Sequence, residues 1–204
     1  KGYEVQVSLS ILRQLPNILR SEGWHITAVI VGEELIAIEP GDTTENSYGI
    51  SFDIGTTTVV GTLMNLSNGT PMGVRSILNG QAIYGADVIS RISHTMMNEN
   101  GLEELTTKII QSVNKLIEEL LAESGIPSNN VYEVVLAGNA TMIHLLLGID
   151  PAAIGVEPFI TTFDDVIEVV ASEIGLRINP LANIHCLPHL GAYVGADLVG
   201  GLMA

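Results

Sequence analysis

The sequence predicts an α/β fold, with a small α+β unit at the N-terminal end followed by a mixed sheet with helical crossovers. Three observations predict it. Residues 48–78 alternate apolar and polar positions between turn signals, which indicates an antiparallel meander of three strands. Residues 102–123 carry apolar side chains at helical spacing. The apolar run 131–137 precedes a second helix at 140–147, and such strand–helix alternation is typical of a mixed sheet.

The composition restricts the classes of function. The chain has 204 residues, 47% of them hydrophobic, so it can bury a sizeable core in one large domain or two small ones. The formal net charge is −15 with only eight Lys and Arg, so no basic stripe is available for a phosphate backbone. No apolar run approaches the roughly 18 residues of a membrane span. We therefore expect neither a nucleic-acid partner nor a membrane partner.

Cysteine usage suits a cytoplasmic protein. Cys186 is the only cysteine in the sequence, so one chain forms neither a disulfide framework nor a thiolate cluster. No signal-peptide pattern precedes the first predicted element. The sequence begins at Lys1 rather than at Met, and we expect it to be a piece of a longer protein.

The first 46 residues predict a separate unit without catalytic chemistry. Its predicted elements are a helix at 8–20 and strands at 24–31 and 34–39. Pro16 inside the helical segment implies a kink or a division into two helical turns. The polar, breaker-rich segment 40–47 is typical of a linker and marks the domain boundary.

The segment Asp53-Ile54-Gly55-Thr56-Thr57-Thr58 lies between the first two strands of the meander. A glycine lets the backbone approach a ligand closely, and consecutive turn N–H groups with Thr hydroxyls suit phosphate oxygens. Asp53, at the strand end, is placed to position a hydrated divalent cation on those phosphates. The alternative is an ordinary hairpin with a Gly-Thr turn, because Thr is common in strands.

Three further features have more than one interpretation. Arg91 follows Asp87, a good N-cap for a short helix, and either faces an anionic ligand or pairs with a nearby carboxylate; we expect the carboxylate pair. Asn139 ends a strand, where open sheets bind ligands, and it is also a good helix cap; we expect the cap. Segment 159–177 fits a helix and, over 166–171, a strand, so its secondary structure stays open.

A second carboxylate for the site comes from the end of the sequence. Segment 191–204 is rich in small residues, which suits a helix that packs close to another backbone. Asp197 lies near the start of this segment, and we place it at the site together with Asp53.

These motifs resemble a known superfamily and, more narrowly, one family. The segment 53–58 resembles the first phosphate loop of the actin-like ATPases, which include sugar kinases, heat-shock chaperones and actins. The fuller pattern looks like the reductive activators of corrinoid proteins, which are ferredoxin-linked actin-like ATPases. The matching segments are 48–60, 84–92, 138–142 and 194–197, with residues 8–42 similar to the end of that family's middle domain.

The resemblance implies a ribonuclease H-like/actin-like mixed sheet. It implies that residues 1–46 are the C-terminal part of a small α+β middle domain. Residues 47–204 would then be the first subdomain of an actin-like ATPase domain. The implied activity is ATP-driven reduction of the cobalt(II) corrinoid of a partner protein to cobalt(I), with a [2Fe–2S] cluster expected only in a domain outside this chain. The implied cofactors of the chain itself are ATP and Mg²⁺, and a homodimer is a further expectation.

The resemblance also assigns roles to single residues. Asp53 would orient magnesium and water, and Asp197 would act as a base or metal-orienting group. The expected nucleotide contacts are Gly55, Thr56, Thr57, Thr58, Gly138, Asn139 and Gly195.

The sequence departs from the full family pattern in ways that limit the expected activity. Cys186 alone cannot hold an iron–sulfur cluster, which needs four ligands. The sequence contains neither a second Asp-X-Gly-Thr loop nor a later Gly-Gly adenosine motif, so it supplies one wall of an ATP cleft. We therefore predict weak or absent ATP hydrolysis by these residues alone. The alternatives are a sugar or acyl kinase, a dehydratase activator, or a non-enzymatic actin-like scaffold.

Overall fold

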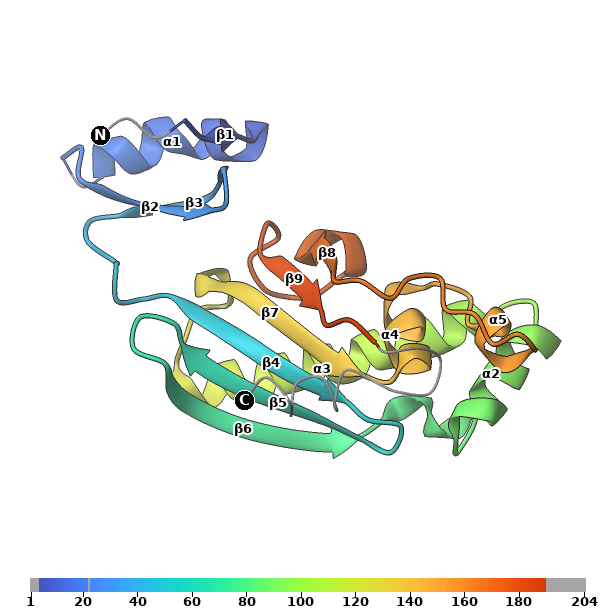
Figure 1. Ribbon diagram of the computed structural model, residues 1–204. Coiled ribbons are helices and arrows are strands. Elements are labelled where there is room, and N and C mark those ends of the chain that lie inside the picture. Colours follow the sequence, from blue (N-terminus) through green and yellow to red (C-terminus); the bar gives the residue numbers. More distant parts are fainter. Residues whose placement is uncertain (1–3, 22, 190–204) are drawn as a thin grey trace.

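The fold is built on two sheets, and the computed structural model describes residues 4–21 and 23–189 of the chain (Figure 1). The smaller sheet has the strand order β1-β3-β2 and belongs to the N-terminal unit. The larger sheet has the order β6-β5-β4-β7-β9-β8 and carries the main hydrophobic core. The segment 191–204, with Gly195 and Asp197, lies outside the described residues.

The N-terminal unit contains the helix and both strands that the sequence predicts. Its elements are β1 (Gln6–Val7), α1 (Leu9–Ser21), β2 (Ile26–Val31) and β3 (Glu34–Pro40). Helix α1 lies against β3, with Ile11 buried beneath it (Figure 1). The helix is one element from Leu9 to Ser21 with Pro16 inside it, so the expected division into two helical turns is not found, and packing on β3 offsets the cost of an interior proline. Gly32 forms the tight turn between β2 and β3 at a positive φ of 59°.

The larger sheet begins with the predicted antiparallel meander. Its strands are β4 (Tyr48–Ile54), β5 (Thr58–Asn65) and β6 (Thr70–Leu78). Side chains alternate along β4, so Phe52 and Ile54 are buried while Asp53 is exposed on the opposite face. This alternation places the carboxylate of Asp53 outside the core and at the end of the strand.

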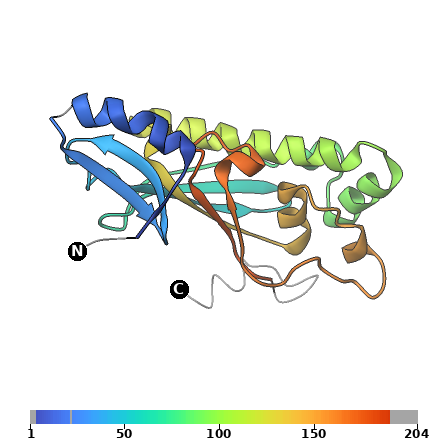
Figure 2. The ribbon, with the colours of Figure 1, turned by 90° about the horizontal axis from the view of Figure 1, so that it is seen from above.

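The crossover from the meander to the parallel part of the sheet is helical. Its elements are η1 (Gly80–Ile83), α2 (Val88–Met97), α3 (Gly101–Ser124) and η2 (Ser128–Asn130), and they lead into β7 (Val131–Gly138), which pairs in parallel with β4. Helix α3 packs against β5 and β6 and runs along one side of the sheet (Figure 2). Its buried Leu105, Ile109 and Leu116 lie on the predicted apolar face. Gly125 ends the helix in the left-handed conformation.

The last part of the described chain completes the sheet. Helix α4 (Ala140–Leu147) and helix α5 (Ala152–Gly155) precede β8 (Ile167–Val170), α6 (Ala171–Ile174) and β9 (Asn183–Cys186). Strand β9 is parallel to β7, and β8 is antiparallel to β9. Segment 159–177 therefore contains both a strand and a helical turn, because its β-branched residues pair with β9 before Gly175 ends the turn at φ 74°. The mixed sheet with helical crossovers is as predicted.

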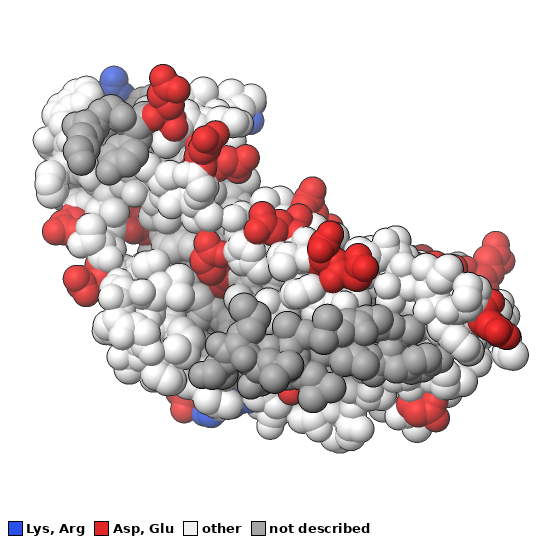
Figure 3. All heavy atoms as spheres, viewed as in Figure 1, with Lys and Arg blue, Asp and Glu red and all other residues white. Residues whose placement is uncertain are grey.

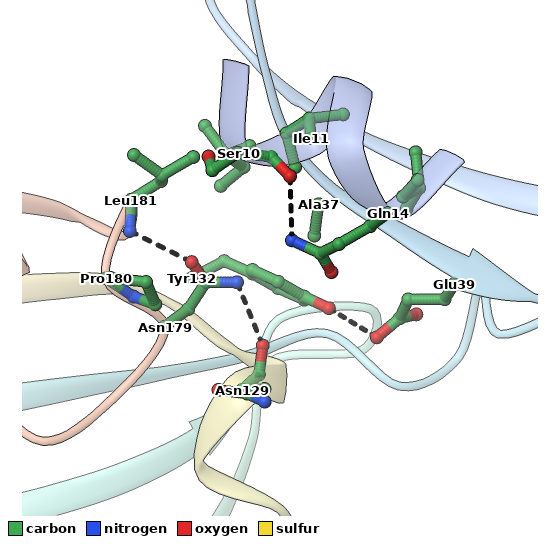
Figure 4. Close-up of a pocket in the computed structure, with 12 residues that line it drawn as sticks. Ser10, Ile11, Gln14, Ala37, Glu39, Asn129, Tyr132, Asn179, Pro180 and Leu181 are labelled. Atoms are coloured by element: carbon green, nitrogen blue, oxygen red, sulfur yellow. Dashed lines mark hydrogen bonds between the residues drawn. The ribbon is translucent and has the colours of Figure 1, made fainter. Parts of the chain in front are cut away.

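Glu39 joins the two units at a small cavity. Its carboxylate accepts a hydrogen bond from the Tyr132 hydroxyl at 2.5 Å and another from the Asn130 side chain. Burial, together with the bond to Glu39, raises the pKa of Tyr132. The cavity, of about 240 Å³, is lined by α1 and β3 from one unit and by the Asn129 and Asn179 segments from the other (Figure 4).

The surface reflects the acidic composition. Acidic side chains are scattered over the face shown in Figure 3, from the N-terminal unit to the opposite end, where α2 and α5 lie, and basic side chains are sparse on it. Within the described ranges, no helix is both long enough and apolar enough to cross a membrane.

Candidate functional site at the ends of β4 and β7

The loop between β4 and β5 is held from behind by three hydrogen bonds. The Asn79 side chain donates from Nδ2 to the Gly55 carbonyl at 2.9 Å, and the Asn79 backbone N–H donates to the Thr57 carbonyl at 2.8 Å. The Arg91 guanidinium donates from Nη2 to the Thr56 carbonyl at 2.6 Å. All three carbonyls of the loop are thus turned toward η1 and α2.

The direction of these carbonyls fixes the direction of the next amides. The peptide bonds of this loop are trans, and a trans peptide points its C=O and its N–H in opposite directions. The N–H groups of Thr56, Thr57 and Thr58 therefore point away from Asn79 and Arg91. Thr57 and Thr58 are also exposed. Backbone amides in a turn are donors of the kind that binds phosphate oxygens.

Two glycines allow the backbone to close up at this point. A Cβ added to Gly55 would lie 2.5 Å from the Thr58 carbonyl oxygen. A Cβ added to Gly138 would lie 2.9 Å from the Ile54 carbonyl oxygen. Backbone atoms that close leave no room for a side chain, so glycine is required at both positions for the loop and the two strand ends to meet.

Asp53 and Asn139 come together because β4 and β7 are parallel. The register pairs Asp53 with Ala137 and Ile54 with Gly138, so both strands end at the same edge of the sheet. Asn139 caps α4 by accepting the Met142 N–H at 3.0 Å, which confirms the expected cap. Its amide also donates to the Thr56 hydroxyl at 3.3 Å. Asn139 therefore links the start of α4 to the loop.

The expected carboxylate pair of Arg91 is wrong for the described part of the chain. Arg91 is fully buried, and none of its hydrogen-bond acceptors there is a carboxylate. The guanidinium donates to the Thr56 and Gly85 carbonyls and to the Gln81 side chain. The neighbouring carboxylate, Asp87, is occupied in capping α2 through hydrogen bonds from Ser90 that lower its pKa.

A cavity of about 580 Å³ adjoins the loop, a volume within the usual range for small-molecule sites. Its lining comes from the loop, from the start of α2 and from the start of α4: Thr56, Thr57, Ala86, Asp87, Val88, Ile89 and Asn139. The loop and Asn139 make one side of it polar, and the residues that begin α2 make the other side mostly apolar. Asp87 is the one charged residue in this lining, so donors for an anionic ligand would have to come from the loop and from Asn139.

The residues at this edge are of the types that a magnesium-bound nucleotide uses. Asp53 supplies one carboxylate, and Mg²⁺ typically uses one or two carboxylates together with phosphate oxygens and water. No cluster of three His, Cys, Asp or Glu suited to an all-protein metal site occurs in residues 4–21 and 23–189. Cys186 is buried in β9, and burial raises the pKa of its thiol to about 12, so it does not suit metal ligation or redox chemistry.

The site thus gathers most of the residues predicted for it. The structure brings together Asp53, the loop 55–58, Gly138 and Asn139, while Asp197 and Gly195 lie outside the described residues. Sequence reasoning missed Asn79 and Gln81, and it misassigned Arg91. The available signal was the Asn79-Gly80 turn just after the meander, followed by one of few basic residues in an acidic chain.

Comparisons with known proteins show the family of the chain. The chain belongs to the RACo family, whose middle-region model matches residues 48–204 and whose linker-region model matches residues 1–45. A corrinoid activation enzyme, RamQ of Eubacterium limosum, is 34% identical over 196 residues, which cover 95% of this chain and 33% of RamQ. The solved structure of a reductive activator for a corrinoid, iron–sulfur protein matches with a TM-score of 0.88 and 34% identity. That match covers 98% of this chain and 32% of the solved one.

These matches confirm the predicted fold class, a mixed sheet of the ribonuclease H-like/actin-like type. They also confirm the predicted family of corrinoid-protein activators. The chain spans about a third of the length of the relatives that it matches.

Proposed function

We propose that this chain is part of an ATP-dependent, iron–sulfur-containing reductive activator that reduces the cobalt(II) corrinoid of a partner protein to cobalt(I). In this proposal residues 1–46, most of which the linker-region model matches, end a small α+β domain. Residues 47–204, which contain the family's middle region, form the first subdomain of the ATPase domain. The chain supplies one wall of the ATP site. The [2Fe–2S] cluster belongs to a domain outside it. Membership of the RACo family and the functions named for its relatives support this proposal.

The observation that carries the proposal is the tied-back loop. Its three carbonyls are bonded to Asn79 and Arg91, so its amides and Thr hydroxyls are left for a ligand beside a cavity of suitable size. In the proposed site these donors hold the β- and γ-phosphates, and Asp53 orients Mg²⁺ and water. Asn139 holds the Thr56 hydroxyl in place. Asp197 and Gly195 complete the proposed set from outside the described residues.

The chemistry of ATP explains why such a site suits an activator. When bound and hydrolysed, ATP supplies free energy that an uphill one-electron transfer requires. The residues of this chain bind and orient the phosphates. A ligand shifts a protein between two conformations only if it binds one of them more tightly. In this proposal the two conformations of the activator therefore differ in their affinity for ATP.

Family membership favours the activator over the other classes that the sequence leaves open. A sugar or acyl kinase, a dehydratase activator and an actin-like scaffold share the phosphate loop with this chain. The relatives at 34% identity are instead named for corrinoid activation. The corrinoid-carrying protein is therefore the proposed partner, and a homodimer and a cytoplasmic location stay predictions.

Nucleotide titration of the 204-residue chain tests the ATP site. Adding Mg·ATP while following backbone amide resonances should shift Thr56, Thr57, Thr58 and Gly138 more than the N-terminal unit. Hydrolysis should be weak or absent because only one wall of the cleft is present. Unchanged loop resonances at saturating nucleotide would contradict the ATP site. Measurable turnover by the chain alone would contradict the single-wall interpretation.

Cobalt reduction tests the activity itself. The longer protein that carries this chain, supplied with a reductant and a corrinoid protein, should generate the cobalt(I) absorption only when ATP is present. ATP-independent reduction at the same rate would contradict the proposed coupling.

A further inference from the structure

The guanidinium of Arg91 is a buried positive charge held by neutral groups. The side chain is 0% exposed. Its donors reach the Thr56 carbonyl at 2.6 Å, the Gly85 carbonyl at 3.0 Å and the Gln81 Oε1 atom at 3.0 Å, and the Met142 sulfur lies at 3.0 Å. Burial lowers the pKa of Arg91, but a guanidinium stays protonated in proteins.

The Asp87 carboxylate stabilises the charge of Arg91 from a distance, but the hydrogen bonds of this buried guanidinium all go to neutral groups, which makes the charge expensive to maintain. Removing a cation from water carries a large desolvation cost, which neutral acceptors repay only in part. Holding the loop carbonyl alone does not require a cation, since the neutral Asn79 amide does the same for the Gly55 carbonyl at 2.9 Å. The hydrogen bond to Thr56 therefore does not by itself explain why a positive charge lies behind the loop.

The bond to Thr56 transmits this charge through one peptide group. A cationic donor on a carbonyl polarises the peptide, and chains of hydrogen bonds strengthen one another in this way. The N–H of the same peptide belongs to Thr57 and points away from Arg91. Thr57 lines the cavity. An acceptor that binds the Thr57 N–H would therefore form a stronger hydrogen bond and would also be attracted by the positive charge of the buried guanidinium.

The second arm of the guanidinium fixes where this donor lies. The bond from Nε to the Gly85 carbonyl ties the loop to the segment that begins α2. The bond to Gln81 ties it to η1, and Gln81 in turn donates to the Leu105 carbonyl of α3 at 3.0 Å. The loop and the opposite rim of the cavity are held in one arrangement by a single side chain.

We propose that Arg91 is a positioning residue for the phosphate site: it locks the loop and polarises the Thr56–Thr57 peptide toward an anion in the cavity. This rests on the proposed function of the loop as a phosphate site. The ligand it favours is the polyphosphate part of a nucleotide, because the Coulomb attraction grows with the charge of the anion.

The test compares Arg91→Met and Arg91→Lys with the wild-type chain of 204 residues. Mg·ATP, inorganic tripolyphosphate and pyrophosphate are titrated while amide resonances are followed. Arg91→Met should bind tripolyphosphate about tenfold more weakly, the usual loss for one charged hydrogen bond. The loss should be smaller for pyrophosphate, and the Thr57 amide proton should lose its ligand-induced shift. Arg91→Lys keeps the charge but lacks the planar fork of the guanidinium. Its affinity for tripolyphosphate should therefore lie between those of the wild type and Arg91→Met.

Arg75→Met is the matched control. Arg75 lies in β6 and forms an exposed ion pair with Glu123 of α3. The substitution removes the same charge and a similar volume, and the variant should bind all three anions as the wild type does. If Arg91→Met binds tripolyphosphate as tightly as wild type, or loses both anions equally, the charge has no role and the proposal fails. If Arg91→Met does not fold, Arg91→Lys is the deciding variant. If Arg91→Lys binds tripolyphosphate with wild-type affinity and keeps the ligand-induced shift of the Thr57 amide, the positioning role of the guanidinium is overturned. If the wild-type chain binds none of the anions, the proposed function fails as well, which separates the two failures.

Discussion

Arg91 and Thr56 lie 35 residues apart in the sequence, yet the guanidinium of one donates to the carbonyl of the other at 2.6 Å. This contact joins the meander, which carries the loop, to helix α2, which forms the opposite rim of the cavity. The loop is therefore a supported structure rather than a free hairpin turn. Its conformation is set by groups behind it, and the predictions below separate that support from the ligand contacts in front.

Gly55→Ala should distort the loop. The added Cβ would lie 2.5 Å from the Thr58 carbonyl oxygen, so the backbone must move, at a cost of about 1–3 kcal/mol. We expect a lower free energy of unfolding in urea and loss of the loop shifts on adding Mg·ATP. Gly73→Ala in β6 is the control, because its Cβ would meet Leu120 at an ordinary 3.5 Å. Wild-type behaviour of Gly55→Ala would show that the loop tolerates a side chain.

Asn139 serves the helix and the loop through different atoms, and two variants separate them. Asn139→Ala removes the cap of α4 and should cost about 1 kcal/mol of stability. Asn139→Asp keeps an acceptor for the Met142 N–H but removes the donor to Thr56 and adds a negative charge beside the phosphates. It should keep the urea midpoint and weaken nucleotide binding. Equal nucleotide affinity in Asn139→Asp and wild type would place Asn139 in the helix cap alone.

Asp53→Asn should separate metal binding from folding. The side chain is exposed at the end of β4, and Asn has nearly the same shape as Asp, so the variant should fold. If Asp53 orients Mg²⁺, the magnesium-dependent part of ATP affinity should fall about tenfold or more. Glu118→Gln, on an exposed position of α3, removes the same charge and should leave binding unchanged. Magnesium dependence that survives in Asp53→Asn would contradict the assigned role.

Stability should fall in mild acid because of a buried histidine. The His144 Nδ1 atom lies 2.7 Å from the Ala140 carbonyl, and Nε2 accepts the Thr162 N–H at 3.1 Å, an arrangement that requires the neutral ring. Burial lowers the pKa of His144, and burial also lowers the pKa of the neighbouring His189.

A lowered histidine pKa gives stability that is complete above the unfolded pKa of about 6.5 and is lost as pH falls through the folded pKa. The urea midpoint of the wild-type chain should therefore decrease below about pH 6.5. His144→Leu should be less stable at neutral pH, since it leaves the Thr162 N–H without its acceptor, but should show a smaller decrease with acid. An identical pH dependence in both chains would show that His144 does not bind the proton.

Much of the fold could be predicted because its signals are local. The face of α3, the end of that helix at Gly125 and the alternation in β4 follow from spacing within a few residues. The secondary structure of segment 159–177 could not be assigned from the sequence. Its strand, β8, is a short edge strand, and it is stabilised by pairing with β9, which follows later in the sequence. The continuity of α1 through Pro16 was likewise undecided, since its packing on β3 is not a local property.

The candidate site also has a part that the sequence predicted and a part that only the tertiary structure decided. The sequence by itself determined the composition of the loop, the acid at the end of β4 and the family to which these motifs belong. Tertiary structure decided what holds the loop in place: Asn79 reaches it from 24 residues away, Arg91 from 35 and Asn139 from 83. Whether a charged side chain meets a carboxylate, water or a buried carbonyl depends on desolvation, and desolvation is set by segments that only folding brings together. For that reason Arg91 appeared in the sequence as one half of an ion pair, and in the structure it lies behind the loop 55–58.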